Sequence, residues 1–84
     1  MKKIDITQLI TKEVITNDKK YMGHIGGFDN IHVIVKNGLF NPRYYKIPRE
    51  KVGSYQNGKV LLSISEQDTK RQFKTKYPGY FKNN

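Results

Sequence analysis

The sequence contains no cysteine, which excludes a disulfide framework and any metal site built on thiolates. It also has no apolar run near the roughly 20 residues that a membrane-spanning helix requires. The basic start, Met1-Lys2-Lys3, leads straight into polar residues, so the apolar stretch of a signal peptide is missing. Because an absence of cysteine also fits a reducing compartment, we expect a cytoplasmic protein without a membrane span.

Acidic residues are scarce relative to basic ones. The chain of 84 residues has 7 aspartates and glutamates against 16 lysines and arginines, which gives a formal net charge of +9. An excess of this size favours anionic partners, such as RNA, DNA, an acidic protein face or anionic lipid. Thirteen of the cations are lysines, and a coat of lysine also serves simply to keep a protein soluble. Charge therefore leaves both interpretations open.

Groups suited to catalysis are few. The histidines are His24 and His32, and both fall in expected strands, where they could be cross-strand neighbours. A zinc site built on them would still need carboxylates such as Asp29 or Glu50, so ordinary strand histidines are the simpler interpretation. The carboxylates are scattered, and no pair has a spacing typical of acid–base catalysis. We expect no enzymatic activity, no cofactor and no metal.

Short β-type runs separated by turn signals fill most of the chain. The turn residues gather at 17–20, 29–30, 37–38 and 56–58, and Asn57-Gly58 is a typical hairpin turn. The runs between them predict strands at 13–15, 21–28, 31–35, 43–47, 52–55 and 59–63. Five or six short strands at this spacing predict a mostly β fold, a small barrel or a strongly bent sheet. Glycines 23, 26 and 27 in the second run favour bulges that curve the sheet.

Alternation along these runs indicates which side chains face inward. Ile31 and Val35 share a face with Val33, and Ile34 lies on the other face. The predicted core consists of Val14, Ile25, Ile31, Val33, Val35, Tyr45, Ile47, Val52, Val60 and Leu62.

The last part of the chain has the pattern of a helix. Ser65 is a suitable N-cap and an acidic residue, Asp68, follows three positions later. The helix is predicted over 66–77, where Pro78-Gly79 ends it. We therefore expect one domain, 1–84, with a β part at 4–64, a C-terminal helix segment at 65–77 and a basic aromatic tail at 78–84.

Two stretches are candidates for contact with a partner. The helix carries an apolar edge, Phe73 and Tyr77, and a basic stripe on its opposite side. The stretch 40–46 interleaves aromatic residues with cations, an arrangement that can stack on unpaired bases and hold phosphates. The alternative is that Phe40 and Tyr45 fill the core and Tyr44 lies exposed on the sheet. The candidate binding residues are Arg43, Tyr44, Lys46, Lys70, Arg71 and Lys74.

The order of the segments resembles the PRC-barrel superfamily, closest to a small subgroup of stand-alone members. The resemblance covers about residues 4 to 68. It rests on Ile4-Asp5, Glu13-Val14-Ile15, Asn17-Asp18, Gly23-His24-Ile25, Ile31-His32-Val33, Tyr45-Lys46-Ile47-Pro48, Val52 and Gly58-Lys59-Val60-Leu61-Leu62. It departs from the subgroup at the first turn, where Asp18-Lys19 stands in place of the usual Asp-Gly.

The resemblance implies a partner-binding role and carries over no catalytic residue. Relatives include the cytoplasmic domain of the photosynthetic reaction-centre H subunit and the C-terminal domain of a ribosome maturation factor, in which the barrel is an adaptor. Our first hypothesis is therefore a non-enzymatic adaptor that binds a protein or ribonucleoprotein. The alternative is direct binding of RNA or DNA by the basic, aromatic surface. A homodimer, formed through an open edge strand or the C-terminal aromatics, is a further alternative.

Overall fold

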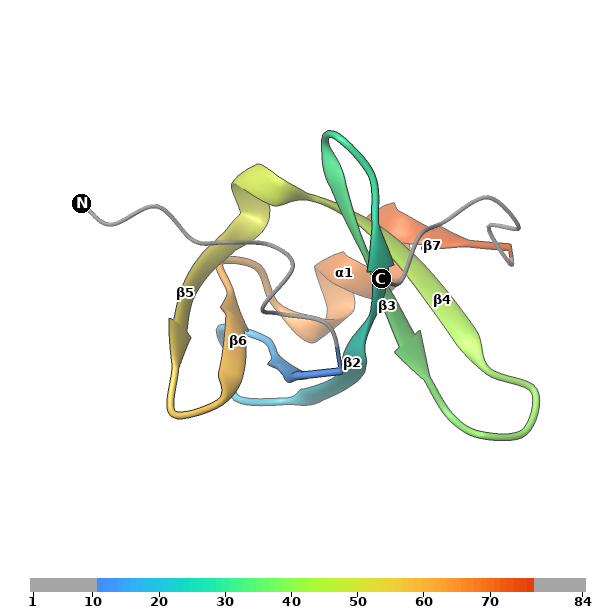
Figure 1. Ribbon diagram of the computed structural model, residues 1–84, viewed down its shortest axis with the longest axis horizontal. Coiled ribbons are helices and arrows are strands. Elements are labelled where there is room, and N and C mark those ends of the chain that lie inside the picture. Colours follow the sequence, from blue (N-terminus) through green and yellow to red (C-terminus); the bar gives the residue numbers. More distant parts are fainter. Residues whose placement is uncertain (1–10, 77–84) are drawn as a thin grey trace.

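The computed structural model describes residues 11–76, which form one bent sheet with a helix against it (Figure 1). The strand predictions are confirmed, with ends that differ by no more than one or two residues. The elements are β1 (Glu13–Ile15), β2 (Tyr21–Phe28), β3 (His32–Asn37), β4 (Arg43–Pro48), the 3-10 turn η2 (Arg49–Lys51), β5 (Val52–Gln56), β6 (Lys59–Leu62), α1 (Glu66–Phe73) and β7 (Lys74–Thr75).

The seven strands lie in the order β5-β6-β1-β2-β3-β4-β7. All neighbours are antiparallel except β1 and β6, which are parallel. The sheet is strongly bent. It is also open, because β5 and β7 stand at its two ends. The predicted mostly β fold with a C-terminal helix is confirmed as a bent sheet, and a short seventh strand is added to the predicted six.

The sheet bends at two irregularities in β2. The first lies opposite β1, where the register shifts between Val14 and Ile15 beside Gly23. Gly23 has a φ of +121°, and a Cβ built on it would lie 2.3 Å from the carbonyl oxygen of Lys36. The second lies opposite β3, between Ile25 and Gly27. The glycines of β2 therefore curve the sheet, as their place inside a strand run indicates.

The core fills the concave side of the bend. Its members come from β1 to β4 and from β6: Val14, Met22, Ile25, Val33, Val35, Tyr45, Ile47, Val60 and Leu62. Val52, Ile64 and Phe73 pack against this cluster from its border. Most of the predicted core is thereby confirmed, although Val52 is only partly buried.

Ile31 was wrongly predicted to be in the core, because its side chain is 65% exposed. The carboxylate of Asp29 accepts hydrogen bonds from the backbone N–H groups of Ile31 and His32, at 2.9 and 2.7 Å. These bonds hold Ile31 in the turn before β3, so the strand alternation does not extend to it.

Two further apolar side chains are buried outside the core cluster. Ile34 is fully buried and Tyr44 is 9% exposed, yet neither belongs to the cluster on the concave side. They lie on adjacent strands, β3 and β4, at positions that alternate with the core residues. The interpretation of Tyr44 as an exposed residue is therefore wrong.

The helix begins as predicted but ends earlier. The Ser65 hydroxyl accepts the N–H of Asp68 at 3.2 Å, which confirms the N-cap. The helix ends at Phe73, not at residue 77, because Lys74 and Thr75 turn into β7 and pair with Tyr45 and Tyr44 of β4. Tyr77 and the predicted tail at 78–84 lie outside the described residues.

The turn between β1 and β2 holds the start of the helix. The carboxylate of Asp18 accepts the Thr16 hydroxyl and, at 3.1 Å, the N–H of Glu66. The hydrogen bond from Thr16 is the main cause that lowers the pKa of Asp18 below its ordinary value. Lys19 takes the left-handed conformation, with a φ of +68°, that glycine supplies in an Asp-Gly turn.

Candidate functional site

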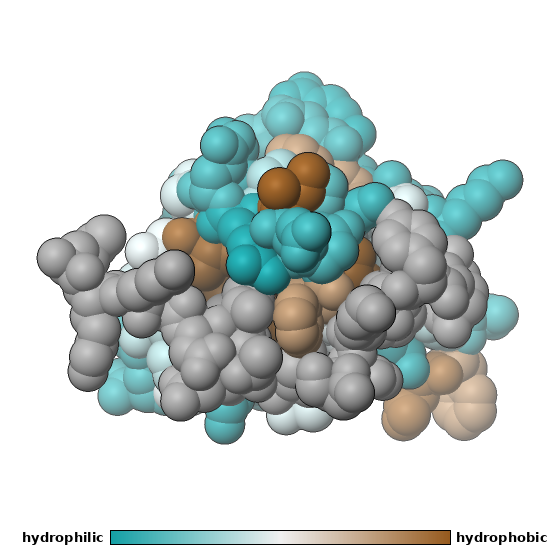
Figure 2. All heavy atoms as spheres, turned by 45° about the horizontal axis from the view of Figure 1, so that its top comes forward, coloured by the Kyte–Doolittle hydropathy of each residue, from teal (hydrophilic) through white to brown (hydrophobic). Residues whose placement is uncertain are grey.

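The loop that joins β3 to β4 carries two bare apolar side chains. Leu39 is 79% exposed and Phe40 is 89% exposed, the highest values among the large apolar residues that the structure describes. Figure 1 shows this loop projecting at the lower right of the sheet, and Figure 2 shows an apolar group at the matching corner. The interpretation that Phe40 and Tyr45 both fill the core is therefore wrong for Phe40. It is confirmed for Tyr45, which is 1% exposed.

The base of the loop is held by the sheet. Asn37 pairs with Arg43 at the last position of the β3–β4 ladder. The side-chain amide of Asn37 donates to the carbonyl of Met22 in β2, with 3.1 Å between the two atoms. Leu39 and Phe40 thus project from a loop whose ends are anchored, which limits the conformational entropy that binding would cost.

Cations gather beside this loop through the pairing of β4 with β7. Tyr45 is opposite Lys74, and Tyr44 is opposite Thr75, the last residue of β7. Arg43 precedes Tyr44 and Lys76 follows Thr75 in a bend, so both lie at the end of this paired segment. By strand alternation Arg43 shares a face with Tyr45, and therefore with Lys74 opposite it. Arg43, Lys74 and Lys76 are all exposed, and no described carboxylate forms an ion pair with them. We refer to Leu39, Phe40, Arg43, Lys74 and Lys76 as the cationic tip.

The sequence around the cationic tip is free of acidic residues. No aspartate or glutamate occurs between positions 36 and 46, or between 69 and 76. Neighbouring charges of one sign reinforce one another, so this corner is a suitable place for an anion to bind. Lys76 was missed by the sequence analysis. The acid-free stretch up to Lys76 is the signal that could have found it.

The remaining predicted binding residues are placed elsewhere. Lys70 forms an ion pair with Glu66 at 3.4 Å, and Arg71 forms one with Asp68 at 2.6 Å. Lys46 lies 3.8 Å from the carboxylate of Asp29. Tyr44 is buried, and with Lys46 it lies on the face of β4 opposite to Arg43. Of the six predicted residues, only Arg43 and Lys74 belong to the cationic tip.

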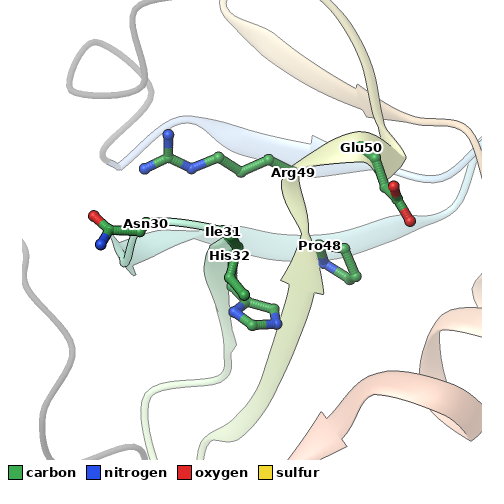
Figure 3. Close-up of a pocket in the computed structure, with 6 residues that line it drawn as sticks. All are labelled: Asn30, Ile31, His32, Pro48, Arg49 and Glu50. Carbon is green, nitrogen blue, oxygen red and sulfur yellow. The ribbon is translucent and has the colours of Figure 1, made fainter.

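A second polar cluster lies at the opposite end of β3 and β4. A pocket there is lined by Asn30, Ile31, His32, Pro48, Arg49 and Glu50 (Figure 3). Figure 3 shows Arg49 extending toward Asn30 while Glu50 points the other way. Arg49 donates to the carbonyl of Asp29 and its guanidinium lies 5.8 Å from the centre of the Phe28 ring.

The polar groups of this corner bind one another. The Asp29 carboxylate contacts the His32 ring at 3.1 Å and accepts the two backbone N–H groups that form the turn. Burial raises the pKa of Asp29, but the hydrogen bonds from Ile31 and His32 outweigh it, so that the pKa lies below its ordinary value. These contacts hold the β2–β3 turn together, and the hydrogen bonds from Arg49 to the carbonyls of Asp29 and Ile31 join it to η2, which is a structural role.

The histidines are not cross-strand neighbours. His24 pairs with Glu13 and Lys36, whereas His32 pairs with Pro48 at the far end of β3. Within residues 11–76, no three histidines, aspartates or glutamates come close enough to hold a metal ion. The zinc site that the sequence left open is therefore not formed by the described residues.

Comparison of the chain with protein-family models, with curated proteins and with solved structures finds no match. In the part of the chain that the structure describes, no helix has the length and apolar character needed to span a bilayer. The site must therefore be interpreted from its own geometry.

Proposed function

We propose that this protein is a non-enzymatic binding module, an adaptor that docks an anionic partner on the cationic tip. One observation carries the proposal: Leu39 and Phe40 project from an anchored loop beside three exposed cations that lack a carboxylate partner among the described residues. The resemblance to PRC-barrel adaptors in the sequence is in keeping with this role.

The tip combines the two contributions that a binding surface uses. Burying a side chain such as phenylalanine or leucine against a partner contributes about 1.5 to 3 kcal/mol. The cations steer an anionic partner to the site and orient it, although each exposed charge adds little affinity. Binding hot spots are typically a few well-packed side chains surrounded by contacts that add little energy but exclude water.

The contacts of Asp29 and Asp18 support a binding role over a catalytic one. Asp29 accepts the backbone N–H groups of Ile31 and His32 in its own turn, and Asp18 accepts the Thr16 hydroxyl and the N–H of Glu66 at the start of α1. A general base must instead have its carboxylate available to substrate. The proposal therefore assigns no catalytic residue.

The test is the salt concentration at which the protein elutes from immobilised heparin, a polyanion. The tip variant Arg43→Gln/Lys74→Gln/Lys76→Gln removes three charges from the site. A matched control, Lys12→Gln/Lys20→Gln/Lys51→Gln, removes the same charge from the β1 flank, the β1–β2 turn and η2. We expect the tip variant to elute clearly earlier than the control. Equal elution of the two variants means that net charge alone governs binding, and contradicts the proposal.

A further inference from the structure

The cations of the tip lie close together at the end of the β4–β7 pairing. Lys74 lies in β7 and Lys76 lies in the bend that follows it, so their Cα atoms are at most about 7 Å apart. Arg43 precedes Tyr44, the partner of Thr75, and so lies near this pair of lysines. The separation of the two lysines is comparable with that of successive phosphates in an extended nucleic-acid strand.

The aromatic ring of the tip is available beside these cations. Phe40 is 89% exposed, so both ring faces are free of protein contacts in large part. Unpaired bases stack on such rings without regard to sequence, whereas bases inside a duplex already stack on each other. An acidic protein would match the charges but would make no particular use of an open aromatic face.

We infer that the anionic partner of the cationic tip is single-stranded nucleic acid. Phe40 stacks on a base, and Arg43, Lys74 and Lys76 bind consecutive phosphates. This inference rests on the proposed function, and it moves the nucleic-acid surface from the helix stripe, where Lys70 and Arg71 are paired with carboxylates, to the edge formed by β4 and β7.

Stacking is tested with a tryptophan at the tip. The wild-type chain has no tryptophan, so the Phe40→Trp variant reports from this position alone. Titration with ten-nucleotide oligo(dT) or oligo(U) is expected to quench its emission strongly and saturably. The matched control is Ile31→Trp, at a site that is also exposed (65%) but lies at the opposite end of β3, and it is expected to show little quenching.

Three further ligands separate the classes of partner. Heparin, poly-L-glutamate and vesicles of phosphatidylserine and phosphatidylcholine are anionic but have no bases. If poly-L-glutamate or the vesicles bind the Phe40→Trp variant as tightly as the oligonucleotides do, the partner is not nucleic acid and the inference is overturned. Equal quenching of the two tryptophan variants by oligonucleotide overturns it as well.

Affinity and its salt dependence test the individual contacts. With a fluorescently labelled oligonucleotide and anisotropy detection, Phe40→Ala is expected to bind about 5- to 150-fold more weakly, the range for loss of one stacked base. Arg43→Gln is expected to reduce the slope of log K against log salt by about 0.7, the contribution of one phosphate on a single strand. An unchanged affinity for Phe40→Ala refutes the inference.

The two proposals fail in different ways. If heparin retention depends on the tip while oligonucleotides neither bind nor quench, the adaptor proposal stands and the nucleic-acid inference is refuted. If the tip and control variants elute from heparin together, both are refuted. Far-ultraviolet circular dichroism of each variant checks that the fold is intact, as we expect for residues that are exposed in the structure.

Discussion

Replacing Gly23 by alanine is the most direct test of how the sheet bends. Gly23 lies at the bulge where β2 passes between β1 and β3, with a φ of +121°. An alanine Cβ at this position would lie 2.3 Å from the carbonyl oxygen of Lys36 and 2.9 Å from its carbonyl carbon. Both of these atoms are backbone, so the contact cannot be relieved by rotating a side chain.

The expected loss of stability follows from two contributions. An alanine forced into a left-handed backbone conformation costs about 1–2 kcal/mol. Relieving the contact requires β2 and β3 to separate locally, with loss of two or so ladder hydrogen bonds of about 1 kcal/mol each. The sum is about 3–4 kcal/mol. A domain of this size has a free energy of unfolding of about 4–13 kcal/mol, so the variant is expected to lose between about a quarter and nearly all of its stability.

The matched control is Gly58→Ala in the β5–β6 turn. Gly58 also has a positive φ, +76°, but a Cβ on it meets no atom within 4 Å. This variant should lose only the backbone contribution, about 1–2 kcal/mol. Urea unfolding followed by circular dichroism gives both free energies. If Gly23→Ala is no less stable than Gly58→Ala, the close approach of β2 to β3 is wrong, and with it our account of the bend.

Further predictions concern single side chains. The folded pKa of Asp29 is below its ordinary value of 3.8, so its stabilising contribution is complete above that value and is lost as pH falls through the folded pKa. In urea unfolding, Asp29→Asn should therefore have a lower free energy of unfolding than the wild type at neutral pH. That free energy should also fall less than the wild type's as the pH is lowered. Thr69→Val removes a buried hydroxyl that donates to the Ser65 carbonyl and should lower the melting temperature through a loss of about 1 kcal/mol. Ile34→Ser should cost about 3–5 kcal/mol and Ile31→Ser less than about 0.5; the reverse order in chemical denaturation would contradict the burial pattern.

The strands could be predicted from the sequence because their signals are local. Alternation within β3 and β6 depends on a side-chain period of two, and the Asn57-Gly58 turn fixes the β5–β6 hairpin by itself. The positive φ values of these two residues, +53° and +76°, are those that the hairpin signal implies. Elements defined by neighbours in the sequence are therefore found at nearly their predicted places.

The core errors arise where a turn or bulge changes the alternation. Met22 enters the core because the bulge beside Gly23 places an extra residue on the concave side. Ile31 leaves it because the Asp29 carboxylate holds its backbone in a turn. Both effects change which face a residue occupies without changing its hydrophobicity, so a pattern of apolar residues does not detect them.

The binding surface was only partly predictable, for a reason that differs between the helix and the strand. The helix pairs could have been deduced, because Glu66 and Lys70 are four apart, Asp68 and Arg71 are three apart, and such spacings place charges side by side. The tip could not, because Arg43 and Lys74 are brought to one corner only through the pairing of β7 with β4. That pairing begins where the helix ends at Phe73, and it places two lysines of an expected helix, one in β7 and one in the bend after it, at a sheet edge. The charges of the cationic tip are therefore ones whose positions depend on long-range pairing. A variant that prolongs α1 through residue 76 should remove this site while keeping every charge.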